Sequence, residues 1–280
     1  MEKYSVLMSL YYKEKPEYLK LAIQSMIEQT YKPDEIVIVK DGKITDELEQ
    51  VLNEFDKDNP KLFNIVGYEK NIGLGLALNY GLEHCNNDLV ARMDTDDISK
   101  SDRCEKQVKH FDKNPELAIV GSNVDEFNGE ITNITGVRVV PSSSKDIYEF
   151  AKKRSSFNHP AVMYRKSKVL KFNGYSDLRR NQDVDLFGRM LFGGCKAENI
   201  NESLLYFRSD DNLSKRRKSW ENTKSYIDTI KRFWKMGYSS FGDYLMVAFA
   251  QTIMFICPLK VQNWLYKKFL RKRYFNKNEW

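Results

Sequence analysis

The first 100 residues alternate between short apolar runs and stretches with helical spacing, and this alternation limits the fold more than any other feature of the sequence. The predicted strands are Ser5–Leu10, Glu35–Val39, Leu62–Val66 and Asp88–Met93. Three helices are predicted between them: the first begins at Pro16, the second covers Glu47–Phe55 and the third covers Leu76–His84. This alternation is typical of βαβ units, so we expect an α/β fold with a mostly parallel central sheet flanked by helices.

Polar residues stand at the ends of three predicted strands. They are Ser9 and Tyr11 at the first strand, Asp41 after the second, and Asp94, Asp96 and Asp97 after the fourth. Parallel sheets bind ligands in the crevice beyond the carboxyl ends of their strands. The sequence therefore predicts that all three groups face one crevice.

Beyond residue 100 the regular alternation ends. The predicted elements are helices over Arg103–Asn114 and Asp183–Gly193 and strands over Leu117–Val124 and Ser203–Arg208. Residues 128–160 are rich in Ser, Asn and Thr and are expected to be irregular. From Trp220 onward the chain is aromatic and is expected to be helical. We therefore predict an α/β domain over residues 1–212 and a helical region over residues 213–280.

Composition excludes several classes of protein. With 41% apolar and 13% aromatic residues, the chain can build a sizeable core, which excludes bulk disorder. No run of 18 or more uncharged apolar residues is present, so the sequence contains no standard membrane-spanning helix. The four cysteines form no CxxC pair and lie at no zinc-binding spacing, which favours buried thiols in a reducing compartment.

Charge is divided unevenly along the chain. Residues 1–126 contain 16 basic and 25 acidic residues, whereas residues 127–280 contain 29 and 14. Residues 258–280 contain seven basic residues and one acid, and a basic amphipathic helix is predicted over Val261–Tyr274. Such a helix favours binding to an anionic membrane surface, and the alternative is a helix packed on the domain with its basic side in solvent. Nucleic acid is not an expected partner, because the half with the clustered acids is negatively charged and no groove-reading motif is present.

Asp94-Thr95-Asp96-Asp97 is the sharpest chemical signal in the sequence. Two or three carboxylates at a strand end form an oxygen site suited to Mg²⁺ or Mn²⁺, which would hold a diphosphate. The structural alternative is a helix cap, in which the side chain of Asp97 or Ser99 accepts a backbone N–H from the first turn of the next helix.

Two further sequences near the predicted crevice remain open to two interpretations. Asp41 could accept a base N–H of a nucleotide, or it could belong to an Asp-Gly turn. The loop Asn71–Gly75 resembles a phosphate-binding glycine loop because it precedes a helix. It lacks the third glycine and the lysine of the strong motifs, so a tight turn before a helix is the alternative.

Three residues in the second half are candidates for a functional site. Asp183 and Asp185 precede an apolar helix, where a carboxylate could act as a general base or could cap the helix. His159 is one of three histidines and could belong to the functional site or be purely structural. No nucleophile set of the Ser/His/Asp or Cys/His kind is evident.

Taken in order, several segments resemble glycosyltransferase family 2, nucleotide-sugar transferases with the GT-A fold. The segments are SVLMSLYY, IEQTYKPDEIVIVKDG, NIGLGLALNYGLEHCNNDLVARMDTDDIS and RCEKQ, and the resemblance covers about residues 3–210. It is nearest to the bacterial exopolysaccharide and O-antigen branch, including the amylovoran-type enzymes. Lys40 replaces the first acid of the family's DDGS motif, and Gln182 stands where the family's ED motif has Glu.

The resemblance implies a role for each matching residue. Ser9, Tyr11, Asp41, Asn71, Asp94 and Asp96 would bind the nucleotide-sugar, with Asp41 on the uracil ring. Asp97, with Asp96, would hold Mn²⁺ or Mg²⁺. Asp183 would be the general base, and His159 and Asp185 would be possible acceptor-site residues.

The activity implied is inverting transfer of one sugar from a UDP-sugar to a polyprenyl-diphosphate-linked saccharide in O-antigen, capsule or exopolysaccharide synthesis. Glucose or galactose, joined by a β1,3 bond to GlcNAc-diphosphate-undecaprenol, is the expected pairing. The enzyme would lie peripherally on the cytoplasmic face of the bacterial inner membrane, held through residues 258–280. The alternatives are a sugar-phosphate nucleotidyltransferase and a non-catalytic membrane-associated scaffold.

Overall fold

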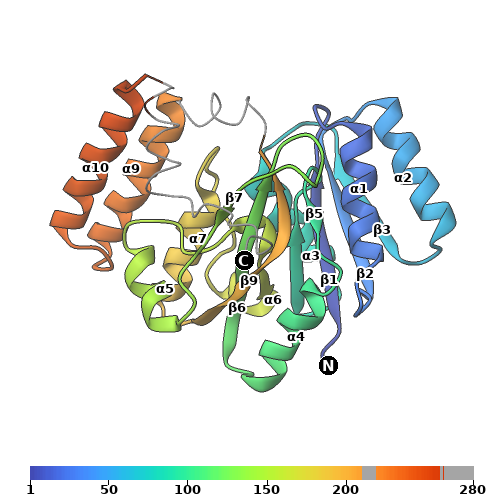
Figure 1. Ribbon diagram of the computed structural model, residues 1–280, viewed down its shortest axis with the longest axis horizontal. Helices are drawn as coiled ribbons and strands as arrows, with labels where there is room; N and C mark the ends of the chain where they lie inside the picture. Colours follow the sequence, from blue (N-terminus) through green and yellow to red (C-terminus); the bar gives the residue numbers. More distant parts are fainter. Residues whose placement is uncertain (210–218, 259–260, 262–280) are drawn as a thin grey trace, which may run out of the picture.

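The computed structural model describes residues 1–209, 219–258 and 261, and these form a mixed α/β fold around one sheet (Figure 1). Within that part of the chain the sheet has nine strands, in the order β3-β2-β1-β4-β8-β6-β9-β5, with β7 beside β6. The first four strands are β1 (Tyr4–Leu10), β2 (Glu35–Asp41), β3 (Phe63–Tyr68) and β4 (Leu89–Met93). They pair in parallel, as predicted.

The remaining strands mix directions. They are β5 (Ile98–Ser99), β6 (Leu117–Phe127), β7 (Ile134–Arg138), β8 (Met163–Arg165) and β9 (Lys196–Arg208). The short β8 runs antiparallel between β4 and β6, whereas β9 runs parallel to β6 and antiparallel to β5. The sheet is therefore parallel at one side and mixed at the other.

Helices cover both faces of the sheet. They are α1 (Pro16–Ile27), α2 (Asp46–Asp58), α3 (Leu74–His84), α4 (Arg103–Lys113), α5 (Ser144–Ala151), α6 (Lys166–Lys171), α7 (Gln182–Phe192), α9 (Trp220–Lys235) and α10 (Phe241–Ile256). Successive strand residues point to opposite faces, so Val6 and Met8 pack with α1, α2 and α4, while Leu7 packs with α3, α7 and α9. Because both faces are covered, β1, β2 and β4 are almost entirely buried, which is why they appear as mainly apolar runs in the sequence.

The prediction of an irregular stretch over residues 128–160 is wrong. Strand β7 pairs antiparallel with β6, and α5 begins after Ser143, whose hydroxyl accepts the N–H of Asp146. The predicted strand Ser203–Arg208 is also only the end of the longer β9. Strand β9 includes the polar residues Glu198 and Asn199 and pairs with β6, which is far away along the chain, so local composition does not reveal its full length.

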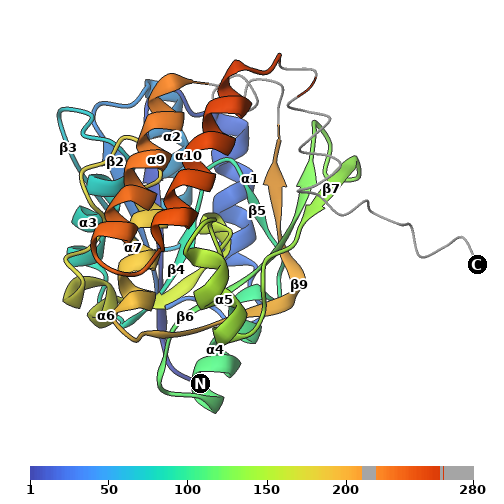
Figure 2. The same ribbon diagram turned by 90° about the vertical axis from the view of Figure 1, so that its left-hand side faces the viewer.

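The C-terminal helices α9 and α10 lie side by side at one edge of the molecule (Figures 1 and 2). Ile230 and Phe233 of α9 are buried in the same apolar cluster as α7. The predicted boundary at residues 212 and 213 and all but Val261 of the predicted basic helix Val261–Tyr274 lie outside the described residues. Among the helices of the described ranges, none combines the length and hydropathy that crossing a bilayer requires.

Candidate active site

The carboxyl ends of the parallel strands meet at one edge of the sheet. Met8 of β1 pairs with Met93 of β4, and Leu10 pairs with Lys40 of β2. Asp41 pairs with Tyr68 at the end of β3. The strand-end groups singled out in the sequence, from Ser9 and Tyr11 to the acids after β4, therefore lie at the same edge.

Asp94, Asp96 and Asp97 form one carboxylate cluster, with one oxygen from each lying within 4.8 Å of the others. Asp97 is buried, and its Oδ1 accepts the backbone N–H of Arg208 at 2.8 Å. Its Oδ2 is buried without a hydrogen-bond partner among the described residues. Asp94 forms an ion pair with the buried guanidinium of Arg92.

The charge on this cluster is not balanced by protein groups alone. Burial, Asp94 and Glu14 together raise the pKa of Asp96 to about 7. Burial and the two neighbouring acids raise the pKa of Asp97 well above its usual range. A divalent cation would remove this repulsion and would give the unpartnered Asp97 oxygen a ligand, so the donor set fits a hard metal ion.

Side-chain contacts hold the loop that carries the cluster. The Nε of Arg208 donates to the carbonyl oxygen of Asp96 at 2.8 Å, and Thr95 Oγ1 donates to Glu14 Oε2 at 2.7 Å. The Arg208 guanidinium lies 3.8 Å from the ring centroid of Tyr18. The helix-cap alternative for these acids is wrong, because α4 begins at Arg103 and its N-cap residue is Asp102.

Asp41 organises the loop after β3. Its Oδ1 accepts from the Tyr68 hydroxyl at 3.0 Å and from the Ile72 N–H at 2.8 Å. Its Oδ2 accepts from Asn71 Nδ2 at 2.8 Å and from the Gly73 N–H at 3.1 Å. Gly73 has φ +95°, a conformation that favours glycine, and it precedes the first turn of α3. The structure thus brings Asp41 and Asn71 together. The loop Asn71–Gly75 has the geometry of a tight turn before a helix, which was one of its two interpretations.

Asp183 lies in the first turn of α7, after Asn181, whose backbone is left-handed at φ 58°. Burial raises the pKa of Asp183, while the Val184 N–H and the charges of Arg138 and Arg92 act in the opposite direction. The side chain is therefore a carboxylate in a poorly solvated position, suited to accepting a proton.

Arg92, which sequence reasoning did not select, joins these groups electrostatically. Its side chain is 1% exposed, and its Nε and Nη1 have no hydrogen-bond partner among the described residues. Its charge acts on Asp94 and Asp97, and also on Asp183. The charge of one buried arginine therefore acts on both the carboxylate cluster and Asp183 of α7. The signal that was available is an arginine inside the otherwise apolar strand Leu89–Met93.

His159 is also near this cation. Its Nε2 lies 2.9 Å from the Tyr175 hydroxyl, and its ring contacts those of Tyr175 and Phe187. Burial and the charge of Arg92 hold the pKa of His159 well below its usual range. The imidazole is therefore neutral near pH 7.

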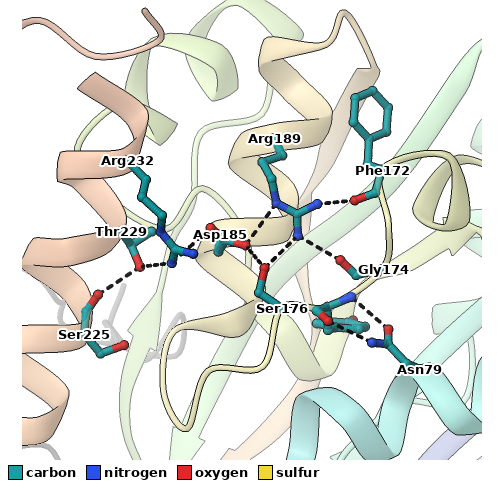
Figure 3. Close-up of polar contacts among 10 residues, drawn as sticks. Asn79, Phe172, Gly174, Ser176, Asp185, Arg189, Ser225, Thr229 and Arg232 are labelled. Carbon is teal, nitrogen blue, oxygen red and sulfur yellow. Dashed lines mark hydrogen bonds and ion pairs between the residues drawn. The ribbon is translucent and has the colours of Figure 1, made fainter. Parts of the chain in front are cut away.

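Asp185 is buried between two arginines (Figure 3). Its carboxylate lies 3.0 Å from Arg189 Nε and 3.1 Å from Arg232 Nη2, and it accepts from the Ser176 hydroxyl. Arg189 in turn donates to the carbonyl oxygens of Phe172 and Gly174. These contacts join α7 to the 172–176 segment and to α9. Asp185 therefore stabilises the fold, and this role is independent of any contact with an acceptor.

Replacing Asp185 with alanine is expected to reduce the free energy of unfolding by about 3 kcal/mol, because two arginines lose a buried counter-charge. Urea denaturation would measure the change. The matched control is Glu69→Ala, since Glu69 pairs with Lys43 while both side chains are at least 80% exposed. That change should cost no more than about 0.5 kcal/mol. Equal losses for the two variants would contradict the structural part assigned to Asp185.

A model of the family described as Glycosyl transferase family 2 matches residues 5–178. The chain belongs to glycosyltransferase family 2. A glycosyltransferase of Haemophilus influenzae is 38% identical over 96% of this chain and all of its own length. The UDP-Gal:alpha-D-GlcNAc-diphosphoundecaprenol beta-1,3-galactosyltransferase of Escherichia coli is 35% identical over 96% of this chain and 97% of its own. The amylovoran biosynthesis glycosyltransferase AmsE of Erwinia amylovora is 35% identical over 95% and 98%.

Solved glycosyltransferases share the fold. The mannosyltransferase PcManGT of Pyrobaculum calidifontis, in complex with GDP-Man and Mn²⁺, has a TM-score of 0.64 at 15% identity, over 89% of this chain and 69% of its own. TarS 1–349 of S. aureus with UDP-GlcNAc has a TM-score of 0.59 at 16% identity, over 83% and 73%. The GT-A fold and the glycosyltransferase activity predicted from the sequence are thus confirmed, as is the relationship to exopolysaccharide and O-antigen enzymes.

Proposed function

We propose that this glycosyltransferase moves one sugar, galactose or glucose, from a UDP-sugar to a saccharide on a polyprenyl diphosphate, with inversion at the anomeric carbon. The observation that carries the proposal is the buried Arg92, whose charge acts on both the carboxylate cluster and Asp183. A donor-diphosphate site and a base that serve one reaction would both be within electrostatic range of this side chain. The name of the Escherichia coli relative supports galactose and a β1,3 bond to GlcNAc-diphosphate-undecaprenol.

In this proposal Asp183 is the general base. Its carboxylate takes the proton from the acceptor hydroxyl, whose oxygen attacks the anomeric carbon as the bond to UDP breaks. Asp183 fits this part because its burial raises its pKa and makes the carboxylate a better proton acceptor. His159 would contact the acceptor as a neutral hydrogen-bonding group.

Asp96 and Asp97 would hold Mn²⁺ or Mg²⁺, and the ion would supply positive charge to the departing diphosphate. Asp94 and Asp96 would orient the ribose and phosphates, while Ser9, Tyr11 and Asn71 would line the nucleotide site. Asp41 would meet the uracil ring. Because its two oxygens already accept four hydrogen bonds, a uracil N–H would have to share or displace one of them.

Mn²⁺ affinity is expected to rise with pH between about 6 and 8, because Asp96 has a pKa of about 7 and must be ionised to bind the ion. Below this pKa a proton competes, so affinity should fall about tenfold for each pH unit. Calorimetry at several pH values would measure it. Asp96→Asn should bind more weakly and show a shallower dependence, because Asp97, whose pKa is also raised, remains. An affinity independent of pH in the native protein would contradict the assignment.

The activity itself is tested by measuring UDP release from a panel of UDP-sugars, with Mn²⁺ and a water-soluble GlcNAc-diphosphate acceptor. Release from one sugar that requires both metal and acceptor is the expected result. Pyrophosphate release from UTP and a sugar phosphate would instead favour a nucleotidyltransferase. Absence of release from every nucleotide-sugar, including GDP-sugars, would contradict the proposal.

We also propose that the enzyme acts peripherally at the cytoplasmic face of the bacterial inner membrane, where a polyprenyl-linked acceptor would be reached. The presence of seven basic residues and only one acid in residues 258–280 supports attachment there. Deleting residues 258–280 without loss of membrane pelleting would contradict this attachment.

A further inference from the structure

The segment RCEKQ, residues 103–107, contributes no group to the proposed reaction, yet two of its polar side chains are completely buried. Arg103 and Gln107 lie one turn apart at the start of α4, and both have a relative exposure of 0%. Residues four apart lie on the same side of a helix, so the two side chains reach the same neighbours. Their hydrogen bonds go to one short turn, His159–Ala161, and to the two strands beside it.

Arg103 holds two backbone carbonyl oxygens that lie far apart in the sequence. Its Nη1 donates to the carbonyl oxygen of Pro160 at 2.8 Å, and its Nη2 donates to that of Arg92 at 3.3 Å. Arg92 is the second-last residue of β4, and Pro160 is the middle residue of the turn that begins with His159. One planar guanidinium therefore fixes the end of β4, which precedes the carboxylate cluster, relative to the turn that carries His159.

Gln107 holds the next carbonyl oxygen of the same turn. Its Nε2 donates to the carbonyl oxygen of Ala161 at 2.9 Å and to that of Val120 in β6 at 2.9 Å. Because both neighbours are carbonyl oxygens, the amide nitrogen must face them, and Oε1 is left buried without a hydrogen-bond partner among the described residues. The consecutive carbonyl oxygens of Pro160 and Ala161 are thus both bonded by side chains of α4.

Stability alone does not account for a buried arginine at this place. No acid forms an ion pair with Arg103 in the described part of the chain, and the other hydrogen-bond contacts of its guanidinium are with the sulfur atoms of Met26, Met93 and Cys104. Burying a charge without an opposite charge costs free energy, and a well-packed apolar side chain of similar size would avoid that cost. The arrangement therefore indicates a role for the position of the two carbonyl oxygens.

The turn places His159 on the face of α7 that carries Asp183. The ring centroids of His159 and Phe187 lie 5.9 Å apart, and Phe187 follows Asp183 by four residues on α7. The Nε2 of His159 lies 2.9 Å from the Tyr175 hydroxyl, which holds the imidazole from another side. A displacement of the turn would therefore move the imidazole relative to the proposed base.

We propose that Arg103 and Gln107 are positioning residues for sugar transfer, which fix the His159 turn relative to the carboxylate cluster. An acceptor sugar bound at His159 would then lie in line with the donor held at the cluster. This part in transfer rests on the proposed function, whereas the control of the turn does not. Donor binding should not depend on Gln107, because Arg208 and Thr95 hold the loop of the cluster separately.

Histidine NMR of the ligand-free protein tests whether α4 controls the turn. The chain has three histidines, and His159→Gln identifies the imidazole signal of His159. Gln107→Met removes both donated hydrogen bonds but keeps a side chain of similar size, so we expect it to shift or split that signal. The matched control is Val108→Ala, which removes buried apolar atoms from the next residue of α4 and should leave the signal unchanged.

Kinetics with a water-soluble GlcNAc-diphosphate acceptor test the positioning. In Gln107→Met we expect kcat/KM for the acceptor to fall by at least about tenfold while UDP affinity in the presence of Mn²⁺ stays native, because only the alignment of the acceptor changes. Val108→Ala should lose stability yet keep the native kcat/KM. Arg103→Lys keeps the charge without the planar fork and should also lose acceptor kcat/KM. If that variant does not fold, Gln107→Met alone decides.

An unchanged His159 signal in Gln107→Met would overturn the proposal. A native kcat/KM for the acceptor in that variant would overturn it too, since the turn could then move without consequence for transfer. Equal kinetic losses in Gln107→Met and Val108→Ala would mean that both act through stability alone, which is also contrary to the proposal. A native enzyme that transfers no sugar would defeat the proposed function, and that failure is distinguishable because it appears before any variant is compared.

Discussion

Asp97→Asn is expected to reduce sugar transfer by about 10³-fold, the largest loss expected from any single carboxylate of the cluster. The buried side chain would lose the charge that holds a divalent ion against the departing diphosphate, which is worth several kcal/mol of barrier. The asparagine Oδ1 can still accept the Arg208 N–H, so the fold should remain. Steady-state UDP release with saturating donor and Mn²⁺ measures the loss.

The same variant should raise the melting temperature of the metal-free protein, by about 2 °C or more. The pKa of Asp97 is raised in the folded state, so its ionisation above the unfolded value near 3.8 destabilises the fold as pH rises. Removing the carboxyl removes that cost near pH 7. A matched control is Asp88→Asn at the opposite end of β4, which should lower stability but keep the turnover rate. An active Asp97→Asn enzyme would contradict the metal assignment.

Asp183→Asn is expected to reduce the turnover number by about 10² to 10⁴-fold while leaving UDP affinity unchanged, because the amide cannot accept the acceptor proton. The native enzyme should lose activity as pH falls through the raised pKa of Asp183, since the base must be ionised. In the variant, residual activity should not show this dependence. Rate measurements across pH with calorimetric UDP binding would separate chemistry from donor affinity.

The control for Asp183 is Asp177→Asn, an exposed carboxylate six residues earlier that should transfer sugar at the native rate. Retention of more than about a tenth of native turnover by Asp183→Asn would mean that another group acts as the base. Loss of UDP binding in that variant would instead place Asp183 in the donor site.

The first four strands and their helices could be predicted from the sequence because their apolar patterns are local. Strand β2 is apolar along most of its length and is buried on both faces, and α1 shows the 3.6-residue spacing of a covering helix. The position of the carboxylate cluster followed from the same reasoning, since it comes directly after β4.

The remaining features depend on contacts between distant residues. Strand β9 includes Glu198 and Asn199 and is held by pairing with β6. A buried arginine in a strand is energetically unfavourable unless acids surround it, and the positions of Asp94 and Asp97 around Arg92 are known only from the fold. Arg208 contacts Asp97 because β9 pairs with β5, the short strand that directly follows Asp97. These placements come from tertiary packing, which one-dimensional periodicity does not contain.

The loop of residues 94–97 is tied to β9 through Arg208, to Glu14 through Thr95, and to the sheet through the pairing of β5 with β9. Most of its conformational entropy is therefore lost when the chain folds and not when a cation arrives. Ion binding should then be accompanied mainly by release of water, with little further ordering of the backbone. Substitutions of Arg208 should therefore lower the affinity for the ion, because the freed loop would lose conformational entropy on binding. No ligand atom of the ion would be removed.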